Sequence, residues 1–208
     1  KKEDIWTEDI KAEKEYISFK VLSKDKKSAT FKVNLLGAHN VENLLMAAAA
    51  AKELGMTLRE ISSASKKIKP EQGGMRFLKN KYNLNVIDAT YSANPTGVIA
   101  DLDYLKIWKG KKAIVMPCLI ELGKSSLEVH KRIGQKIGEI CNLAIITTKD
   151  RFREIKEGAI SAGMREENIL LIESPKEIFA KIKDFCGKED AILLEGRVSK
   201  ELLNLLAA

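Results

Sequence analysis

Residues 85–97 read Asn85-Val86-Ile87-Asp88-Ala89-Thr90-Tyr91-Ser92-Ala93-Asn94-Pro95-Thr96-Gly97. The apolar beginning predicts a short buried strand, and the polar run after it predicts a loop. Asn94 is a favourable N-cap and Pro95 suits the first helical position, so we expect a helix to begin there. Ligands of open α/β sheets bind beyond the carboxyl ends of the strands, which makes this loop a candidate site. The same pattern also fits a helix end that only caps itself.

The chain beyond this segment continues to alternate between strands and helices. The strands are rich in Ile, Val, Leu and Ala without a two-residue period, which is typical of a parallel sheet covered on both faces. We therefore expect an α/β fold with a Rossmann-like, doubly wound, mostly parallel sheet. No Gly-x-Gly-x-x-Gly follows the first strand, so the pattern is not a typical dinucleotide site. The predicted strands lie around 84–88, 112–117, 143–148, 169–173 and 191–195, and the predicted helices around 95–108, 126–140, 151–163, 175–186 and 198–206.

The residues before this sheet have a different organisation. Alternating stretches at 15–21 and 30–35, joined by a polar turn, predict an antiparallel β-hairpin. A helix should open at Gly37-Ala38-His39-Asn40-Val41-Glu42-Asn43 and end near Leu54, with Gly55 in the C′ position. A second helix should run from a Thr57 cap to Ile68, before Pro70.

The segment Pro70-Glu71-Gln72-Gly73-Gly74 is the best candidate for a linker. A hairpin and two helices precede it, and strand–helix alternation follows it. We therefore predict two domains, at residues 1–69 and 70–208.

Composition limits the class of protein. The 208 residues are 45% hydrophobic and 31% charged, which is ordinary for a globular protein. No apolar run approaches the roughly 20 residues of a membrane span, and no signal peptide is visible, so we expect no membrane insertion. The first residue is Lys1 rather than Met, and we expect the chain to be a piece of a longer protein. The net charge is +7, but the lysines are spread over every segment, which indicates a solvated surface and no nucleic-acid partner.

Cysteine and histidine give few options for chemistry. Cys118, Cys141 and Cys186 are widely spaced and odd in number, so we expect reduced, buried thiols in a cytoplasmic protein. Two histidines support neither a Ser–His–Asp triad nor a histidine zinc site, and we predict no metal site from this chain.

Two polar groups stand out apart from residues 88–94. His39, Asn40 and Asn43 lie together at a predicted helix start, a pattern that taken alone favours an Asn N-cap with an incidental second Asn. Glu121 follows the second sheet strand and His130 lies on the next helix. They could form an acid–base pair. The favoured interpretation is a loop-stabilising carboxylate and a partly exposed helix residue.

Three segments together resemble one family, the Mur ligases. Residues 37–43 are similar to the Gly-x-His-Asn-x-x-Asn signature late in the central ATPase domain of that family. Residues 88–95 are similar to the Asp-Asp-x-Tyr-Asn-x-Asn-Pro loop of its C-terminal domain. Ile120-Glu121-Leu122-Gly123, with His130 downstream, is similar to the Glu-Leu-Gly…His stretch of the branch that adds D-alanyl-D-alanine. The resemblance covers nearly the whole chain.

The resemblance implies a function for the complete protein. Residues 1–69 would be the end of the central ATPase domain, and residues 70–208 the C-terminal domain that closes over ATP. The family uses ATP and Mg²⁺ to activate a carboxylate as an acyl phosphate, which an amine then attacks to form an amide. For this branch the substrates are a UDP-MurNAc-peptide and D-Ala-D-Ala, in cytoplasmic peptidoglycan precursor synthesis.

The resemblance also implies roles for individual residues. The nucleotide-binding residues would be His39, Asn40 and Asn43 near adenine, with Asp88 approaching the ribose and phosphates. Arg76, matched to the Arg of the family's interdomain Gly-Arg segment, would stabilise developing charge in catalysis, because a guanidinium is always charged and can bind two oxygens. The residues toward the amino substrate would be Tyr91, Asn94 and Glu121.

The sequence departs from the family pattern in two ways. Asp88-Ala89 stands where the family often has two acids, so either Asp88 takes over the ribose contact or the contact is lost. The P-loop lysine, the magnesium ligands and the carbamylated lysine have no counterpart, so this chain alone is not expected to catalyse the reaction.

Other branches and another class of protein remain to be weighed. The folyl-polyglutamate branch, with Asp-Gly-x-His-Asn-Pro, and the diaminopimelate-adding branch, with Asp-Asn-Pro-Arg, fit less well. A Mur-like ligase for another carboxylate and amine, and a non-catalytic binding module of the same fold, remain open.

Overall fold

The computed structural model describes residues 4–70 and 74–207, and the chain divides into two compact units, Lys1–Glu71 and Gln72–Ala208. Each unit has its own sheet and its own apolar core. Most of the predicted linker, residues 71–73, lies outside the described residues.

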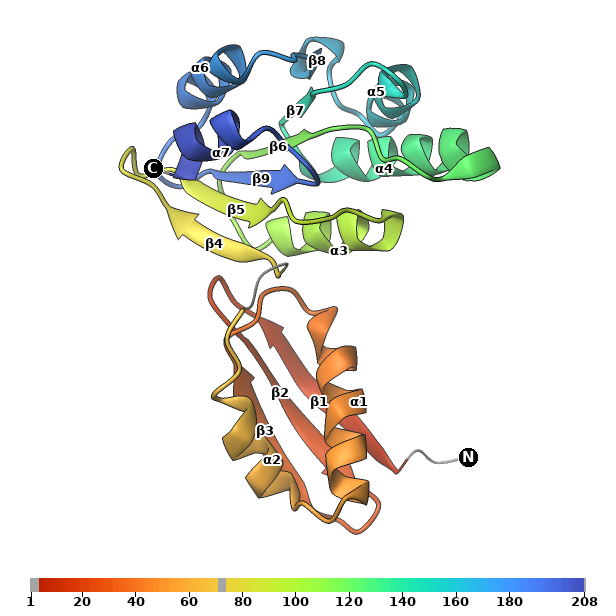
Figure 1. Ribbon diagram of the computed structural model, residues 1–208, viewed down its shortest axis with the longest axis vertical. Coiled ribbons are helices and arrows are strands. Elements are labelled where there is room, and N and C mark those ends of the chain that lie inside the picture. Colours follow the sequence, from red (N-terminus) through yellow and green to blue (C-terminus); the bar gives the residue numbers. More distant parts are fainter. Residues whose placement is uncertain (1–3, 71–73, 208) are drawn as a thin grey trace. The chain divides into compact units, whose positions relative to one another are not determined.

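The N-terminal unit is built on a three-stranded antiparallel sheet in the order β1-β2-β3 (Figure 1). The strands are β1 (Ile5–Ala12), β2 (Ile17–Ser23) and β3 (Ser28–Val33). Alternate residues of β2 and β3 face the core, where the rings of Phe19 and Phe31 stack at 5.3 Å. The hairpin prediction found β2 and β3 but missed β1. The alternation of β1 is broken by a register shift between Glu8 and Lys11, with Asp9 in the left-handed region (φ 55°).

Two helices cover this sheet. α1 (Asn40–Glu53) packs on it through Val41, Leu44 and Ala48. Gly55 follows α1 at φ 96°, the conformation that the C′ position requires. α2 (Leu58–Ser65) begins with a complete capping box between Thr57 and Glu60 and ends one turn before the predicted Ile68.

The C-terminal unit is a six-stranded sheet in the order β4-β5-β9-β6-β7-β8. Only β4 (Arg76–Lys79), at the edge, is antiparallel among its described strand pairs. The sequence did not predict β4, because its four residues are exposed or half-buried and lack an apolar pattern. The parallel strands are β5 (Asn85–Ala89), β6 (Lys112–Met116), β7 (Leu143–Ile146), β8 (Ile169–Leu171) and β9 (Ala191–Glu195).

Helices cover both faces of this sheet, as a doubly wound fold requires (Figure 1). One face packs against α6 and α7 through a core that includes Val86, Val115, Ile145 and Leu194. The other is covered by α3, α4 and α5, of which α4 and α5 pack backbone to backbone at Gly134 and Gly158. The bounds are α3 (Pro95–Leu105), α4 (Ser126–Ile140), α5 (Phe152–Ser161), α6 (Pro175–Phe185) and α7 (Lys200–Ala207), with short 3₁₀ turns at Gly123–Ser125 and Glu166–Asn168.

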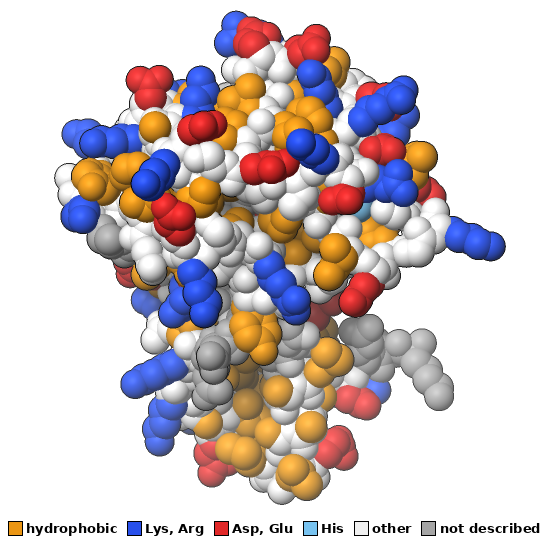
Figure 2. Space-filling model, turned by 45° about the horizontal axis from the view of Figure 1, so that its top comes forward, with side chains coloured by type: hydrophobic (Ala, Val, Ile, Leu, Met, Phe, Trp, Pro, Cys, Tyr) orange, Lys and Arg blue, Asp and Glu red, His pale blue; other side chains and the backbone are white. Residues whose placement is uncertain are grey.

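The distribution of surface charge and the state of the cysteines agree with what the composition predicts. Figure 2 shows basic side chains scattered among acidic ones over the visible face rather than gathered in one patch. Cys118, Cys141 and Cys186 are free and buried, and burial raises the pKa of the Cys141 thiol to about 12. Among the described residues, no helix combines the length and apolarity needed to cross a membrane.

Candidate functional site

A pocket of about 390 Å³ lies at the carboxyl edge of the parallel sheet. At this edge β9 lies between β5 and β6; α3 and α4, which follow β5 and β6, cover one face of the sheet, whereas α7, which follows β9, covers the other. Such a change of direction opens a crevice between the loops. Four loops contribute, those that follow β5, β6, β7 and β9. The lining residues are Ser92, Ala93, Pro117, Cys118, Leu119, Ile120, Glu121, Thr148, Asp150, Gly196 and Arg197.

Two hydrogen bonds to backbone amides fix the conformation of the loop after β6. Cys118 N–H donates to Thr148 Oγ1 at 2.8 Å, and Leu119 N–H donates to His130 Nε2 at 2.9 Å. The prediction of a partly exposed His130 is wrong, because the ring is fully buried and bonded at both nitrogens. Glu121, at the end of this loop, is exposed and has φ 62°, a strained region for a residue with a side chain.

Asp88 and Arg76 form an ion pair with each other. They face one another across the antiparallel β4–β5 ladder, and Arg76 Nη2 lies 2.8 Å from Asp88 Oδ2. The other carboxylate oxygen accepts hydrogen bonds from the backbone and the hydroxyl of Thr90. The Asp88 side chain is 4% exposed, whereas that of Arg76 is 57% exposed, so Arg76 offers the more accessible group to a ligand.

Tyr91 and Asn94 lie on the same loop with different surroundings. The Tyr91 side chain is a large apolar group left 64% exposed, next to Ser92 in the pocket wall. Asn94 caps α3, because its Oδ1 accepts from Gly97 N–H at 2.9 Å, as the sequence predicted. The capping amide is also exposed at the surface.

The N-terminal unit brings His39, Asn40 and Asn43 together. Asn40 Nδ2 donates to Leu36 O at 2.8 Å and lies 3.1 Å from His39 Nε2, and Asn43 Nδ2 donates to Asn40 Oδ1 at 3.4 Å. The expected Asn N-cap is wrong, since His39 occupies the N-cap position and no side chain caps the helix. Asn40 instead orients its two neighbours, whose side chains are exposed.

A buried pair of carboxyl groups lies behind the pocket. Glu195, the last residue of β9, is 1% exposed and hydrogen-bonded to Asp101 of α3, itself 9% exposed. Burial, followed by the charge of Asp101 and its hydrogen bond, raises the pKa of Glu195 to about 9. Glu195 Oε2 has no hydrogen-bond partner among the described residues. The pair therefore keeps a proton near neutral pH.

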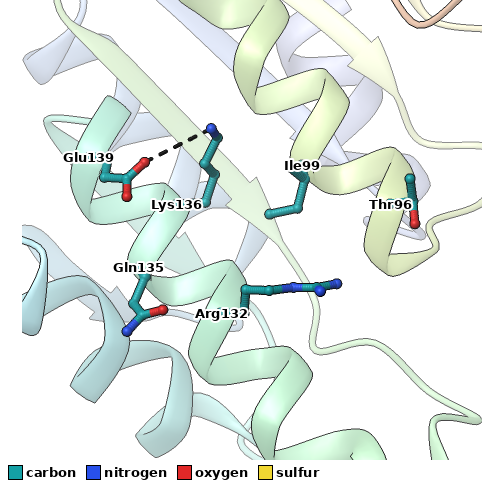
Figure 3. Close-up of a pocket in the computed structure, with 6 residues that line it drawn as sticks. All are labelled: Thr96, Ile99, Arg132, Gln135, Lys136 and Glu139. Atoms are coloured by element: carbon teal, nitrogen blue, oxygen red, sulfur yellow. Dashed lines mark ion pairs between the residues drawn. The ribbon is translucent and has the colours of Figure 1, made fainter.

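A second hollow of about 380 Å³ lies between α3 and α4 (Figure 3). The guanidinium of Arg132 extends toward the beginning of α3, where Thr96 lies, and Lys136 forms an ion pair with Glu139 at 3.9 Å. None of the predicted site residues lines it. The lining residues are Thr96, Ile99, Arg132, Gln135, Lys136 and Glu139.

Comparison with known families matches both units of the chain. Residues 75–198 match the family described as Mur ligase, glutamate ligase domain, and residues 1–51 match the Mur ligase middle domain. The chain belongs to the Mur ligase family.

Several curated Mur ligases are similar in sequence. The UDP-N-acetylmuramoyl-tripeptide–D-alanyl-D-alanine ligase of Haemophilus influenzae is 30% identical over 126 residues, 61% of this chain and 27% of that protein. The corresponding enzyme of Bacillus subtilis is 26% identical over 80% of this chain and 36% of its own length. A UDP-N-acetylmuramoyl-L-alanyl-D-glutamate–2,6-diaminopimelate ligase of Clostridium acetobutylicum is 27% identical over 80% of this chain and 35% of its own length.

Solved Mur ligase structures share the fold. MurF from Acinetobacter baumannii superposes with a TM-score of 0.83 at 23% identity, covering 99% of this chain and 45% of that one. MurF from Thermotoga maritima, in complex with ADP, has a TM-score of 0.74 at 19% identity, covering 98% of this chain and 46% of that one. The chain thus spans less than half the length of the Mur ligases it matches.

Sequence reasoning found some parts of this Mur ligase pocket and missed others. Of the predicted residues, Glu121 lines it, and Tyr91 and Asn94 lie on a loop that contributes to it. Thr148, Asp150 and Arg197 were not predicted. Each lies just after a parallel strand, so the rule that ligands bind at the carboxyl edge could have found all three. Nothing in the local pattern marks the pairing of Glu195 with Asp101.

Proposed function

We propose that this chain is part of an ATP-dependent amide-bond ligase that adds D-alanyl-D-alanine to a UDP-MurNAc-peptide in peptidoglycan precursor synthesis. The observation that carries the proposal is the Mur ligase match over both units, joined to a pocket at the carboxyl edge that Glu121 lines. The D-alanyl-D-alanine ligases of Haemophilus influenzae and Bacillus subtilis support this branch. A cytoplasmic location is part of the same proposal.

The domain assignment is a second part of the proposal. Residues 1–69 would be the C-terminal part of the central ATPase domain and residues 70–208 the C-terminal Rossmann-like domain. The division of the chain into two compact units near residue 71 supports this boundary. The family matches, which end at residue 51 and resume at residue 75, leave the boundary between them.

Each unit presents groups that fit a part of the nucleotide. The exposed imidazole of His39 and amide of Asn43 present the polar groups that an adenine edge requires, and Asn40 holds them in place. Arg76 fits a phosphate, because its guanidinium is accessible while Asp88 fixes its position. Asp88 itself fits the ribose less well, since both of its oxygens are already engaged. ATP would supply the phosphoryl group that activates the carboxylate.

No metal ligand is assigned to this chain. Among the described residues, no three His, Cys, Asp or Glu side chains come together as a metal site would need. The magnesium that accompanies ATP would take most of its protein ligands from residues outside this chain.

The amino substrate would enter the carboxyl-edge pocket. Glu121 is an exposed carboxylate that can attract an ammonium group, and Arg197 can attract a carboxylate on the same small molecule. D-Ala-D-Ala carries both groups, one at each end. A dipeptide also fits a pocket of about 390 Å³.

The test uses the complete open reading frame that contains this chain. The purified protein should release phosphate from ATP only when a UDP-MurNAc-tripeptide and D-Ala-D-Ala are both present. Arg76→Ala should lower the rate by roughly 10- to 150-fold, the effect of one charge-assisted contact, and Arg76→Lys should not fully restore it. Full activity in Arg76→Ala with an unchanged melting temperature would remove Arg76 from the site. Binding of either substrate without turnover would favour a non-catalytic module.

A second candidate is the diaminopimelate-adding activity named for the Clostridium acetobutylicum relative. The chain disfavours it at one place, since Asn94-Pro95 is followed by Thr96 rather than by the Arg of that branch's motif. The same assay decides between them when diaminopimelate replaces D-Ala-D-Ala and a UDP-MurNAc-dipeptide replaces the tripeptide.

A further inference from the structure

We propose that His130 is a positioning residue that sets the conformation of the loop after β6 and thereby the place of Glu121 in the carboxyl-edge pocket. The role of Glu121 toward an amino substrate rests on the proposed function; the effect of His130 on the loop does not. His130 lies nine residues beyond Glu121 on α4 and does not line the pocket itself.

The hydrogen bonds of His130 define which ring nitrogen carries the proton. Nδ1 lies 2.6 Å from the carbonyl oxygen of Ser126, which can only accept, so Nδ1 is the donor. Nε2 lies 2.9 Å from the backbone N–H of Leu119, which can only donate, so Nε2 is the acceptor. The ring is 0% exposed. His130 is therefore a neutral imidazole that joins the first turn of α4 to the loop.

This contact is one of two that turn consecutive loop amides inward. Thr148, just after β7, accepts from Cys118 N–H in the same way. Beyond these two fixed amides the next residues turn outward. Ile120 is 69% exposed, and Glu121 takes up its left-handed conformation at φ 62°. Such a conformation is strained for a residue with a side chain and persists only where the surroundings hold it, as His130 and Thr148 do here.

Further hydrogen bonds fix the position of His130 itself. Arg151 Nε donates to Ser126 Oγ at 3.1 Å, and the same hydroxyl lies 3.4 Å from His130 Nδ1. Arg151 also donates its backbone N–H to Cys118 Sγ at 3.3 Å and forms an ion pair with Glu154. The ring can therefore neither tilt nor withdraw without breaking its hydrogen bonds to Ser126 and to Leu119 of the loop.

Two substitutions separate the hydrogen bond from the volume of the ring. His130→Gln places an amide oxygen near the position of Nε2, where it can accept from Leu119 N–H. His130→Asn is shorter and places its amide near Nδ1, without an acceptor within reach of Leu119. Both variants are smaller than the ring and keep a polar, uncharged side chain, and only Gln keeps an acceptor for Leu119 N–H.

The first measurement is nuclear magnetic resonance on this 208-residue chain. Wild type should show His130 protonated at Nδ1 and not at Nε2, and slow hydrogen exchange at the Leu119 amide. His130→Asn should speed exchange at Leu119 by about tenfold or more, the effect of losing one hydrogen bond, while the amide of Ile145 in β7 stays unchanged. His130→Gln should stay near wild type. Unchanged exchange in His130→Asn, or a proton on Nε2 in wild type, overturns the proposal.

The second measurement is steady-state kinetics on the complete open reading frame. His130→Asn should raise KM for the amino substrate about tenfold while KM for ATP stays unchanged, and His130→Gln should restore it. Equal losses for both substrates, or equal losses in both variants, would show a general structural role instead. If wild type has no ligase activity, the proposed function fails, and the exchange measurement still decides the role of His130.

Discussion

Replacing Glu195 by Gln should stabilise the C-terminal unit at alkaline pH and leave it nearly unchanged in mild acid. Glu195 is buried beside Asp101, and these surroundings raise its pKa from 4.5 to about 9. Above pH 4.5 the unfolded chain releases a proton that the folded chain keeps. The unfolded state is therefore favoured more and more as pH rises from about 4.5 to about 9.

The size of this effect follows from the pKa values. Each pH unit between them lowers the free energy of unfolding by about 1.36 kcal/mol, so raising the pH from 5 to 8 removes up to about 4 kcal/mol in wild type. Gln does not titrate, and its amide can donate to Asp101 as the protonated carboxyl does. Leaving its second N–H unbonded costs about 1 kcal/mol. We expect Glu195→Gln to gain roughly 2–3 kcal/mol over wild type at pH 8 and to be equal or slightly weaker at pH 5.

The chain has a natural reporter for this unit. Of its two tryptophans, Trp6 lies in β1 and Trp108 is buried in the C-terminal unit. In a Trp6→Phe background, fluorescence during urea unfolding follows the C-terminal unit alone. Glu189→Gln is the matched control, because Glu189 is exposed, and it should match wild type at both pH values. A difference between Glu195→Gln and wild type that is the same at pH 5 and pH 8 would refute the shared proton.

Three further predictions concern folding and packing. Gly134→Ala should destabilise the C-terminal unit by about 1–3 kcal/mol, because the added Cβ would overlap Ile155 O; Gly187→Ala, which meets only a distant side-chain oxygen, should be near neutral in the same urea assay. Thr57→Ala removes the capping box and should lower the unfolding free energy of the N-terminal unit by about 1 kcal/mol, followed by Trp6 fluorescence in a Trp108→Phe background. A fragment from Gly74 to Ala208 should unfold cooperatively in calorimetry, because its core lies entirely within that unit; a broad, non-cooperative melt would contradict this.

The parallel sheet could be predicted because its signals are local. β6, β7 and β9 contain continuous apolar runs, and β5 contains the apolar pair Val86-Ile87. The helices between the strands have caps or breakers that the sequence displays, such as Asn94-Pro95 and Ser174-Pro175. β4 could not be predicted in this way, because it pairs with β5 at a sheet edge that exists only after the sheet has formed.

The location of the candidate site could be predicted from the sequence better than the contacts within it. The rule for parallel sheets gives the loop after each strand, and Tyr91, Asn94 and Glu121 lie on such loops, after β5 and β6. It could not reveal that Asp88 is engaged by Arg76, or that His130 turns inward, because these contacts join residues 12 and 11 positions apart. Spacing along the chain predicts which residues lie at the same edge of the sheet, but not which of their atoms are already hydrogen-bonded.

The position of β9 has a consequence for synthesis on the ribosome. β9 is made after the other described strands of this sheet, yet it lies between β5 and β6 in the middle of the sheet. Until residues 191–195 leave the exit tunnel, β4–β5 and β6–β7–β8 are two separate pieces, each with an open edge. A polypeptide that stops before β9 thus exposes two unpaired strand edges, which can pair with other chains. Premature termination before residue 191 should therefore yield aggregates rather than a shortened protein.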